Sequence, residues 1–334
     1  MTPLHVTLVA TPDTQVSPLS GLYETLEAFP LLASIENDVP TRPFHVDIVV
    51  PNDGVKRGAS GLPLGAHLTH DDVEQTDIAI VPLMMVSDLH WETGRYPRLV
   101  RWLERQHAGG AVLASACTGV LLVAETGLLE GREATLHWAF ARTFRENFPG
   151  VRLRTEEVLI TCGPRGELVM TGGVMSWHDL ALHLIARHVG PIAAQSMARL
   201  LMLEWHGKGQ APYVHFSPRL DHGDAAVADA QRWLALHYMS DNPVEEVCAR
   251  TKLSRRTLER RFRAVTGHTP IAYVQELRIE EARRLLERTT HSVEQIGAEV
   301  GYENGGFFRR VFRRVTHLTP SAYRRKFQLR GLGA

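Results

Sequence analysis

Apolar side chains recur at helical spacing in two similar segments, residues 244–273 and 293–323. Each segment contains a short apolar stripe, a polar turn, and a second stripe with apolar residues at positions i, i+4 and i+7. The stripes are Val244, Val247 and Cys248 followed by Leu258, Phe262 and Val265 in the first segment, and Val293, Ile296 and Val300 followed by Phe308, Phe312 and Val315 in the second. Ser254, Ser292 and Asn304 stand where helix N-caps are expected. Each segment therefore predicts a helix-turn-helix unit.

Two further helices are expected around these units. Residues 225–237 predict a helix that opens the C-terminal domain, and residues 271–287 predict one long helix that connects the two units. Ala249 and Ala298 are the small residues that we expect at the helix crossings.

Arginines cluster on the second helix of each unit. The exposed side is expected to carry Arg255, Arg256, Arg260 and Arg263 in the first, and Arg309, Arg310, Arg313 and Arg314 in the second. A guanidinium group suits both phosphates and guanine edges, so each row favours nucleic-acid binding. Solvated arginine-rich helix faces are also common without such a role. Two in tandem over the same apolar pattern favour DNA binding.

Residues from about 227 to 330 resemble the DNA-binding domain of the AraC/XylS family of transcriptional regulators. The resemblance is most specific in the second unit, which closes on Thr319-Pro320 and Tyr323. It implies an all-α domain of seven helices, whose two helix-turn-helix motifs enter successive segments of the major groove. The implied base-reading positions are Arg256, Glu259 and Arg260 in the first unit, and Gly306, Phe307 and Arg310 in the second. The whole expected DNA interface comprises Arg255, Arg256, Glu259, Arg260, Arg263, Asn304, Gly306, Phe307, Arg309, Arg310, Arg313 and Arg314.

The charge distribution agrees with a separate DNA-binding end. The chain of 334 residues has a formal net charge of zero, but from Lys252 onward there are 18 Lys and Arg against 8 Glu and no Asp. The remainder carries the opposite excess. An acidic domain joined to a basic one is typical of a regulator with a DNA-binding domain.

The N-terminal half alternates apolar runs with helical patterns. Strands are expected at residues 5–10, 44–50, 77–81 and 111–116, and helices at 23–32, 97–107, after Gly119 and at 191–204. Buried strands that alternate with helices indicate a parallel sheet covered on both faces, an α/β fold of flavodoxin-like type.

A candidate small-molecule site lies at the end of the fourth expected strand. Cys117-Thr118-Gly119 joins this strand to a helix, as in a nucleophile elbow, and a helix N-terminus there would favour a thiolate. The other candidate pocket residues are His137, Trp138, Trp177 and His178. Cys117 is interpreted as a small turn residue or a ligand-lining residue, whereas a catalytic role is the alternative. Both histidines could equally be structural.

Residues 1–190 resemble the PfpI-type, class I glutamine-amidotransferase-like superfamily. The resemblance is carried by residues 115–119, 127–131, 135–138 and 171–173. Joined to an AraC-type tail, it is similar to the GlxA-like group of regulators. Enzymes of the superfamily pair the elbow cysteine with an acidic residue after the first strand, but here residues 16–23 contain no carboxylate before Glu24. The resemblance therefore implies a regulator and not an enzyme; the alternative is an elbow-cysteine enzyme, such as a hydratase or amidase, fused to a DNA-binding tail.

The expected organisation is a sensing and dimerisation domain at 1–205, a linker at 206–224 and a DNA-binding domain at 225–330. The expected partners are promoter DNA, a small-molecule effector and a second copy of the chain, with RNA polymerase as a further candidate. A nonspecific nucleoid-type binder is disfavoured because the base-facing positions are chemically varied. The three cysteines contain no CxxC pair, so neither a disulfide framework nor a zinc site is expected, and no cofactor is implied. No secretion signal or membrane span is expected, which predicts a soluble cytoplasmic protein.

Overall fold

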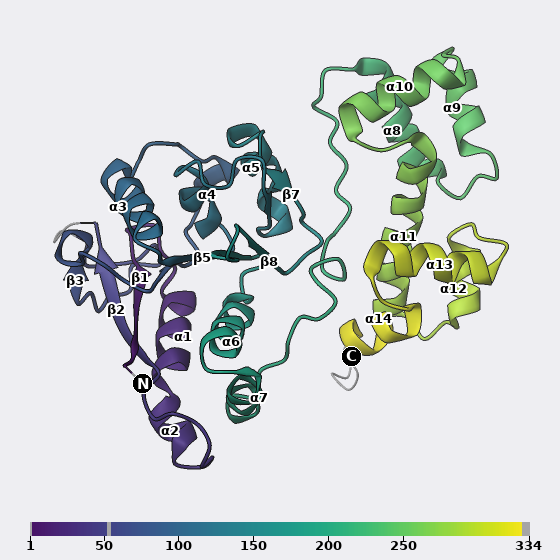
Figure 1. Cartoon of the computed structure of the whole chain (residues 1–334). Helices are drawn as coiled ribbons and strands as arrows, with labels where there is room; N and C mark the ends of the chain where they lie inside the picture. The colour runs from purple at the N-terminus through teal and green to yellow at the C-terminus, as the bar shows by residue number, and fades with distance from the viewer. Residues whose placement is uncertain (1, 52–54, 329–334) are drawn as a thin grey trace. The chain divides into compact units, whose positions relative to one another are not determined.

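A computed structural model describes residues 2–51 and 55–328 of the chain (Figure 1). The chain divides into two compact units between Gln210 and Ala211, inside the segment expected as a linker. The last two residues of the expected DNA-binding domain, 329 and 330, lie outside the described residues. In the described part of the chain, no helix has the length and apolarity needed to cross a bilayer.

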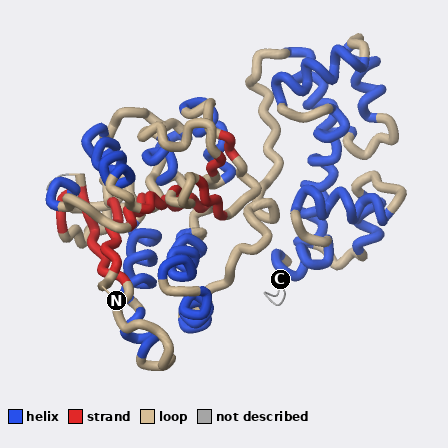
Figure 2. Tube along the Cα trace, viewed as in Figure 1, coloured by secondary structure: helices blue, strands red, loops and turns tan. Residues whose placement is uncertain are grey.

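The first unit is built on a seven-stranded sheet (Figure 2). Its strands are β1 (Leu4–Val9), β2 (Phe44–Val50), β3 (Leu68–Thr69), β4 (Ile78–Val81), β5 (Val112–Ala116), β8 (Leu159–Cys162) and β9 (Leu168–Thr171). The order is β3-β2-β1-β4-β5-β9-β8. All neighbours are parallel except β8, which runs antiparallel to β9. Two short strands, β6 (Glu133–Ala134) and β7 (Arg152–Leu153), pair separately.

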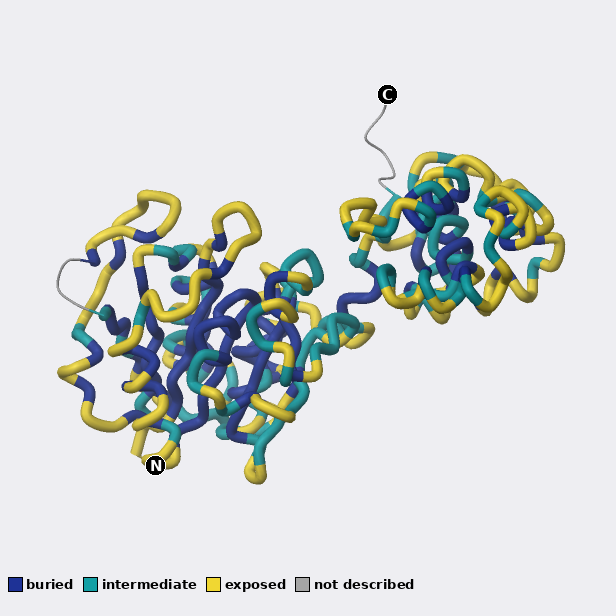
Figure 3. Tube along the Cα trace, turned by 90° about the horizontal axis from the view of Figure 1, so that it is seen from above, coloured by how far each residue is buried: buried dark blue, intermediate teal, exposed yellow. Residues whose placement is uncertain are grey.

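Helices cover both faces of this sheet. They are α1 (Val16–Glu27), α2 (Phe29–Ala33), α3 (Pro97–Ala108), α4 (Gly119–Ala124), α5 (Ala141–Asn147), α6 (Trp177–His188) and α7 (Pro191–Leu200), with short 3-10 turns at His70–Asp72, Ser87–Leu89 and Trp138–Phe140. Alternate side chains of each strand enter opposite cores. On β4, Ile78 and Ile80 pack with α1, α6 and α7, whereas Ala79 and Val81 pack with α3, α4 and α5. Figure 3 shows the buried residues concentrated inside each unit.

The second unit is all-helical. Its helices are α8 (Ala225–His237), α9 (Pro243–Thr251), α10 (Arg255–Thr266), α11 (Pro270–Arg288), α12 (Val293–Glu299), α13 (Gly305–Thr316) and α14 (Pro320–Phe327). The long helix α11 belongs to two separate cores (Figure 1). Tyr273 and Val274 near its start pack with α8, α9 and α10, whereas Ile279 and Leu286 pack with α12, α13 and α14.

The structure confirms the expected class of both units and corrects several boundaries. The four predicted strands are β1, β2, β4 and β5, and the helix predicted at 225–237 is α8. The single helix expected through residues 23–32 is two helices, because Pro30 begins a new helix where its missing N–H costs no hydrogen bond. The helix after the elbow is short and ends at Ala124.

The segment around the division is held by side chains of both units. The Gln210 amide donates to the main-chain oxygens of Leu136 at 2.9 Å and Glu157 at 3.0 Å within the first unit. In the second unit, the buried Arg283 guanidinium donates to the main-chain oxygens of Ala211 at 3.1 Å and of Val214. Each end of this segment is thus bonded to the unit to which it belongs.

Candidate functional sites

The two helix-turn-helix units begin their second helices with side-chain caps. Ser254 accepts a hydrogen bond from the Thr257 amide at 3.3 Å, and Asn304 accepts one from the Phe307 amide at 2.8 Å. Ser292 forms a full capping box at the start of α12. All three predicted caps are thus confirmed, and each satisfies an amide that the helix itself cannot bond. They fix where each arginine-bearing helix starts.

Matching aromatic residues anchor the second helices to their cores. Phe262 and Phe312 are both fully buried. Phe262 meets the ring of Tyr273 edge-on at 5.1 Å between centroids, and Phe312 meets Tyr323 in the same way at 5.5 Å. The equivalent packing presents the opposite face of α10 and of α13 to solvent.

The small residues at the crossings are not the predicted ones. Ala249 and Ala298 are both exposed. In the second unit Gly297 is buried, and a methyl group on it would lie 3.1 Å from the Phe308 ring. The predicted residue, Ala298, is one position after Gly297. One position corresponds to a rotation of about 100° around a helix, so the two residues face different directions.

The arginines of α10 and α13 fall into two groups. Eight of the nine are exposed, and the ninth, Arg261, is half-buried and paired with Asp224. Some are held within the chain: Arg255 by Glu245 and Glu259, Arg309 by Glu294, and Arg314 by Gln275. The side chains of Arg256, Arg260, Arg263 and Arg313 have no hydrogen bond or ion pair with any other described residue. The second group is available to an external anion without breaking a contact.

Two residues of the second unit form an exposed pair of aromatic ring and cation. The Phe307 side chain is 41% exposed, which is unusual for a phenylalanine, and the Arg310 guanidinium carbon lies 5.6 Å from its ring centroid. Phe307 also lies near Tyr302, with ring centroids 5.9 Å apart. An exposed ring beside a guanidinium offers both an apolar contact and a charged hydrogen-bond donor at the start of α13.

The Cys117 elbow exists, but its thiol is not activated. Cys117 has φ of 54°, a conformation rarely adopted by residues with a side chain, and its amide donates to the Thr171 oxygen at 2.7 Å. The side chain is fully buried. Burial raises the pKa of the Cys117 thiol to about 11, although the amides of Thr118, His137 and Gly173 favour the thiolate. The amides at the helix terminus favour the thiolate, as expected, but desolvation of the buried thiol outweighs them.

The other predicted pocket residues make separate contacts and do not all face the same side chains. The Thr118 hydroxyl donates to the Met84 oxygen, and His137 stacks on Trp138 with centroids 5.1 Å apart. Trp177 packs so tightly under α1 that a methyl group on Gly21 would lie 2.6 Å from its ring.

The Trp177 indole N–H is buried and has no acceptor among the described residues. His178 is directed elsewhere, toward the main-chain oxygen of Glu204 at 3.1 Å. Among described residues, no carboxylate is one of the groups that perturb the Cys117 thiol, and Glu24 is exposed on α1.

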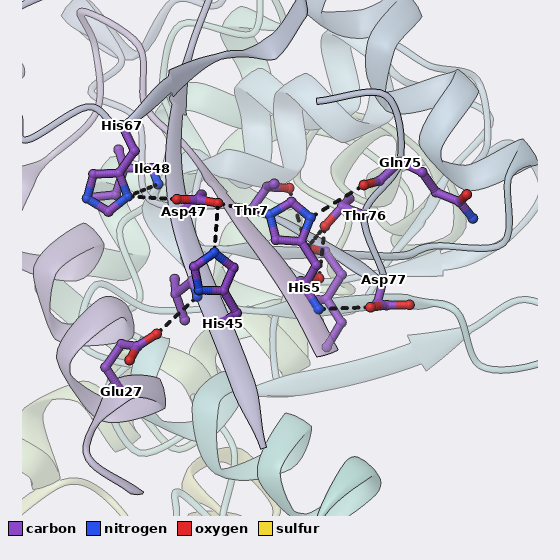
Figure 4. A network of polar contacts seen from close by, with 12 residues as sticks. His5, Thr7, Glu27, His45, Asp47, Ile48, His67, Gln75, Thr76 and Asp77 are labelled. Carbon is purple, nitrogen blue, oxygen red and sulfur yellow. Dashed lines mark hydrogen bonds and ion pairs between the residues drawn. The ribbon is translucent and has the colours of Figure 1, made fainter. Parts of the chain in front are cut away.

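A histidine cluster around Asp47 was not predicted (Figure 4). Asp47 on β2 lies 3.1 Å from His5 on β1, 3.4 Å from His45 and 3.0 Å from His67. Burial opposes ionisation, but the hydrogen bonds from His67 and His5 lower the pKa of Asp47 below its usual value. The register pairs His5 directly with His45. The only sequence signal was a histidine on each of two parallel strands.

Five other histidines have a pKa that burial lowers. Burial lowers the pKa of each below 6.5. His70 is buried, and the others, His137, His183 and His188 in the first unit and His268 in the second, are half-buried. Their protonation would place a charge in the interior, so they make the fold sensitive to acid.

A parallel-sheet unit with a buried elbow cysteine, followed by two helix-turn-helix units, defines a two-domain regulator architecture. The DJ-1/PfpI family matches residues 19–185, and a helix-turn-helix domain matches residues 247–326. The HTH-type transcriptional regulator CdhR of Pseudomonas aeruginosa is 33% identical over 312 residues, which cover 87% of this chain and 86% of that protein. The HTH-type transcriptional regulator GlxA of Rhizobium meliloti is 24% identical over 317 residues, covering 91% and 90%.

The chain belongs to the family of transcriptional regulators that join a DJ-1/PfpI domain to an AraC-type helix-turn-helix domain. This confirms the resemblance seen in the sequence. A solved THiJ/PfpI family protein from Pseudomonas syringae has a TM-score of 0.50 at 17% identity, covering 75% of this chain and 89% of its own. That likeness supports the fold of the first unit.

Proposed function

We propose that this protein is a transcriptional regulator whose second unit binds specific double-stranded DNA through α10 and α13. The observation that carries the proposal is the pair of exposed, cap-started helices, each anchored by one buried phenylalanine. The unpaired arginines of both helices are exposed. Two equivalent surfaces in one unit suit two successive segments of the major groove.

The base-reading residues are Arg260 on α10, and Phe307 and Arg310 on α13. An arginine can bond both acceptors of a guanine edge, and an exposed phenylalanine can contact a thymine methyl group. Gly306 has no side chain to read with. Asn304 uses its side-chain oxygen to cap α13, so a role at DNA would fall to its remaining amide group.

The first test is DNA binding by the full chain across a range of salt concentrations. The expected result is saturable binding to a selected site, with affinity that falls linearly on a logarithmic salt scale because phosphate contacts release counterions. The same measurement on residues 211–334 should show weaker binding that keeps the sequence preference, since this unit has its own two cores. Binding without any sequence preference would contradict the proposal.

We infer that the first unit senses a small molecule at the elbow and does not catalyse a reaction. A thiol with a pKa of about 11 is protonated at neutral pH and is a poor nucleophile. The buried Trp177 N–H without an acceptor is a hydrogen-bond donor that a ligand could satisfy.

The test of this inference compares two single variants, Cys117→Ser and Trp177→Phe, with the wild-type protein. A thermal-shift screen of small nitrogenous metabolites should identify an effector, which at 100 times its dissociation constant adds about 2.7 kcal/mol of stability. Trp177→Phe keeps the ring against Gly21 and should weaken the effector response, whereas Cys117→Ser should leave DNA affinity unchanged. Substrate turnover that Cys117→Ser abolishes would establish the enzymatic alternative.

We also propose that the first unit forms a homodimer through α2 and α7, which contact each other. Ile192 is 72% exposed and Met202 is 90% exposed, with Leu31 and Ile35 also exposed on the neighbouring element. Exposed apolar side chains that gather on neighbouring elements are typical of association surfaces. Sedimentation velocity should show a dimer that Ile192→Glu converts to monomer; an unchanged dimer would place the interface elsewhere. RNA polymerase is the partner expected if the regulator activates transcription.

A further inference from the structure

Two histidines and a carboxylate converge where the chain leaves the first unit. His178 and Asp179 lie in the first turn of α6, and His206 lies after α7, four residues before the end of the unit. The three side chains each present one donor atom, and these atoms all lie within 4.8 Å of one another. Nothing in the spacing of these residues marks the group in the sequence, because His206 is brought to α6 by the fold.

The distances between the donor atoms suit a shared cation. His206 Nδ1 lies 2.7 Å from Asp179 Oδ2, and His178 Nε2 lies 3.6 Å from the same oxygen. The main-chain oxygen of Glu204 lies 3.1 Å from His178 Nε2 and could complete a set of four. Two ligands at about 2.0–2.1 Å from a tetrahedral Zn²⁺ are roughly 3.3 Å apart, so small movements would bring all four into range.

The Asp179 carboxylate is buried in an unusual environment. Its side chain is 3% exposed, and the described groups that contact it are the His206 amide, at 2.9 Å, and the two imidazoles. A buried carboxylate is costly unless its charge is compensated. A bound cation would provide that compensation.

We propose that His178, Asp179 and His206 bind a divalent transition-metal ion, with the Glu204 oxygen as the fourth ligand. Imidazole nitrogens together with a carboxylate favour Zn²⁺ and its first-row neighbours over Mg²⁺ or Ca²⁺, which prefer oxygen ligands only. In the metal-free protein, Nδ1–H of His206 donates to Asp179, and Nε2–H of His178 donates to Glu204. Metal binding requires both nitrogens to be unprotonated, so the proton moves to the other ring nitrogen or to solvent, and affinity falls in acid.

The metal would hold the exit segment against α6. Glu204 and His206 both belong to residues 203–210, which follow α7 and end the first unit. With the ion bound, two coordination bonds tie this segment to α6 in place of the two imidazole hydrogen bonds, beside the bond from the His206 main-chain amide to Asp179. The site therefore stabilises the part of the first unit from which the second unit begins, independently of any DNA contact.

The test is titration of the full, chelator-stripped chain with Zn²⁺ against a chromophoric competitor. We expect one tightly bound equivalent, and a visible absorption band of four-coordinate Co²⁺ when cobalt is used as the probe. His206→Asn keeps an amide that can donate to Asp179 but removes the metal ligand, so it should lower Zn²⁺ affinity at least about 100-fold while leaving the metal-free fold intact by circular dichroism. His45→Asn, in the Asp47 cluster, is the matched control and should leave the affinity unchanged.

Wild-type protein provides a measurement that does not depend on any variant. Zn²⁺ should slow amide hydrogen exchange in residues 203–210 and in the first turn of α6. Absence of a tight equivalent, equal affinity in His206→Asn and wild type, or unchanged exchange in this segment would each overturn the proposal. The hydrogen-bonded group would then be structural only.

Discussion

Three arginine substitutions should separate base recognition from phosphate binding. Arg260 and Arg310 each stand two residues before the buried phenylalanine of their helix, and Arg313 stands one residue after it. The side chains of Arg260 and Arg313 have no hydrogen-bonding partner among the described residues, and Arg310 only stacks on Phe307. Truncation to alanine therefore breaks no ion pair within the protein, and the measured change belongs to the DNA complex.

The magnitudes follow from the kind of contact that each arginine makes. A bidentate contact to guanine is worth about 1–3 kcal/mol of discrimination, roughly a 5- to 150-fold preference at one base pair. Arg260→Ala and Arg310→Ala should each abolish such a preference, at positions about one helical turn, or 10 bp, apart. Arg313 lies further along α13, so Arg313→Ala should lower the affinity for all DNA sequences alike and reduce the slope of log affinity against log salt by about one.

The assay is a binding selection on randomised sites, followed by affinities at several salt concentrations. Arg284→Ala is the matched control, because it removes the same charge from α11 and breaks only an exposed pair with Glu281, worth about 0–1 kcal/mol. If Arg260→Ala and Arg310→Ala lose affinity uniformly while the preferred sequence stays unchanged, these residues do not read bases and the proposed orientation of both helices is wrong.

Three further predictions concern stability. Phe312→Ala should cost about 3–5 kcal/mol in urea unfolding of the second unit, because the ring is fully buried; a loss below about 1 kcal/mol would refute the packing. Acid should destabilise the protein as pH falls through 6.5, because each buried histidine has a lowered pKa when folded and the unfolded chain binds more protons; a melting temperature that is constant from pH 8 to about 5 would contradict this. Gly119→Ala should lower the melting temperature of the first unit, since the added methyl group would lie 2.3 Å from the Val81 oxygen, whereas Gly207→Ala, with open space around it, should not.

The helices of the second unit were predictable from the sequence because the features that form them lie close together in the chain. Helix periodicity, N-caps and a repeated apolar pattern depend on residues within four positions of each other, and Ser254, Ser292 and Asn304 cap the helices as predicted. The errors there were of one position, as with Gly297, because periodicity alone does not resolve which neighbour faces the crossing helix.

In the first unit, apolar runs predicted part of the sheet, but β3, β8 and the buried strand β9 were not predicted. Runs of buried residues made β1, β2, β4 and β5 predictable. The antiparallel strand β8 is only partly buried, and its pattern carries no continuous apolar run. Edge strands take their structure from pairing with a neighbour and less from their own composition, so single-sequence reasoning passes over them.

The sequence by itself determined the two-unit organisation, the class of each unit, and the helices that carry the arginines. Only the tertiary structure decided which arginines are already paired, that burial keeps Cys117 protonated, and which distant histidines meet Asp47 and Asp179. The physical reason is the separation along the chain over which each interaction acts. Periodicity and capping act between near neighbours in the chain, whereas desolvation, ion pairing and ligand convergence depend on atoms separated by up to dozens of residues and are set by how the elements pack.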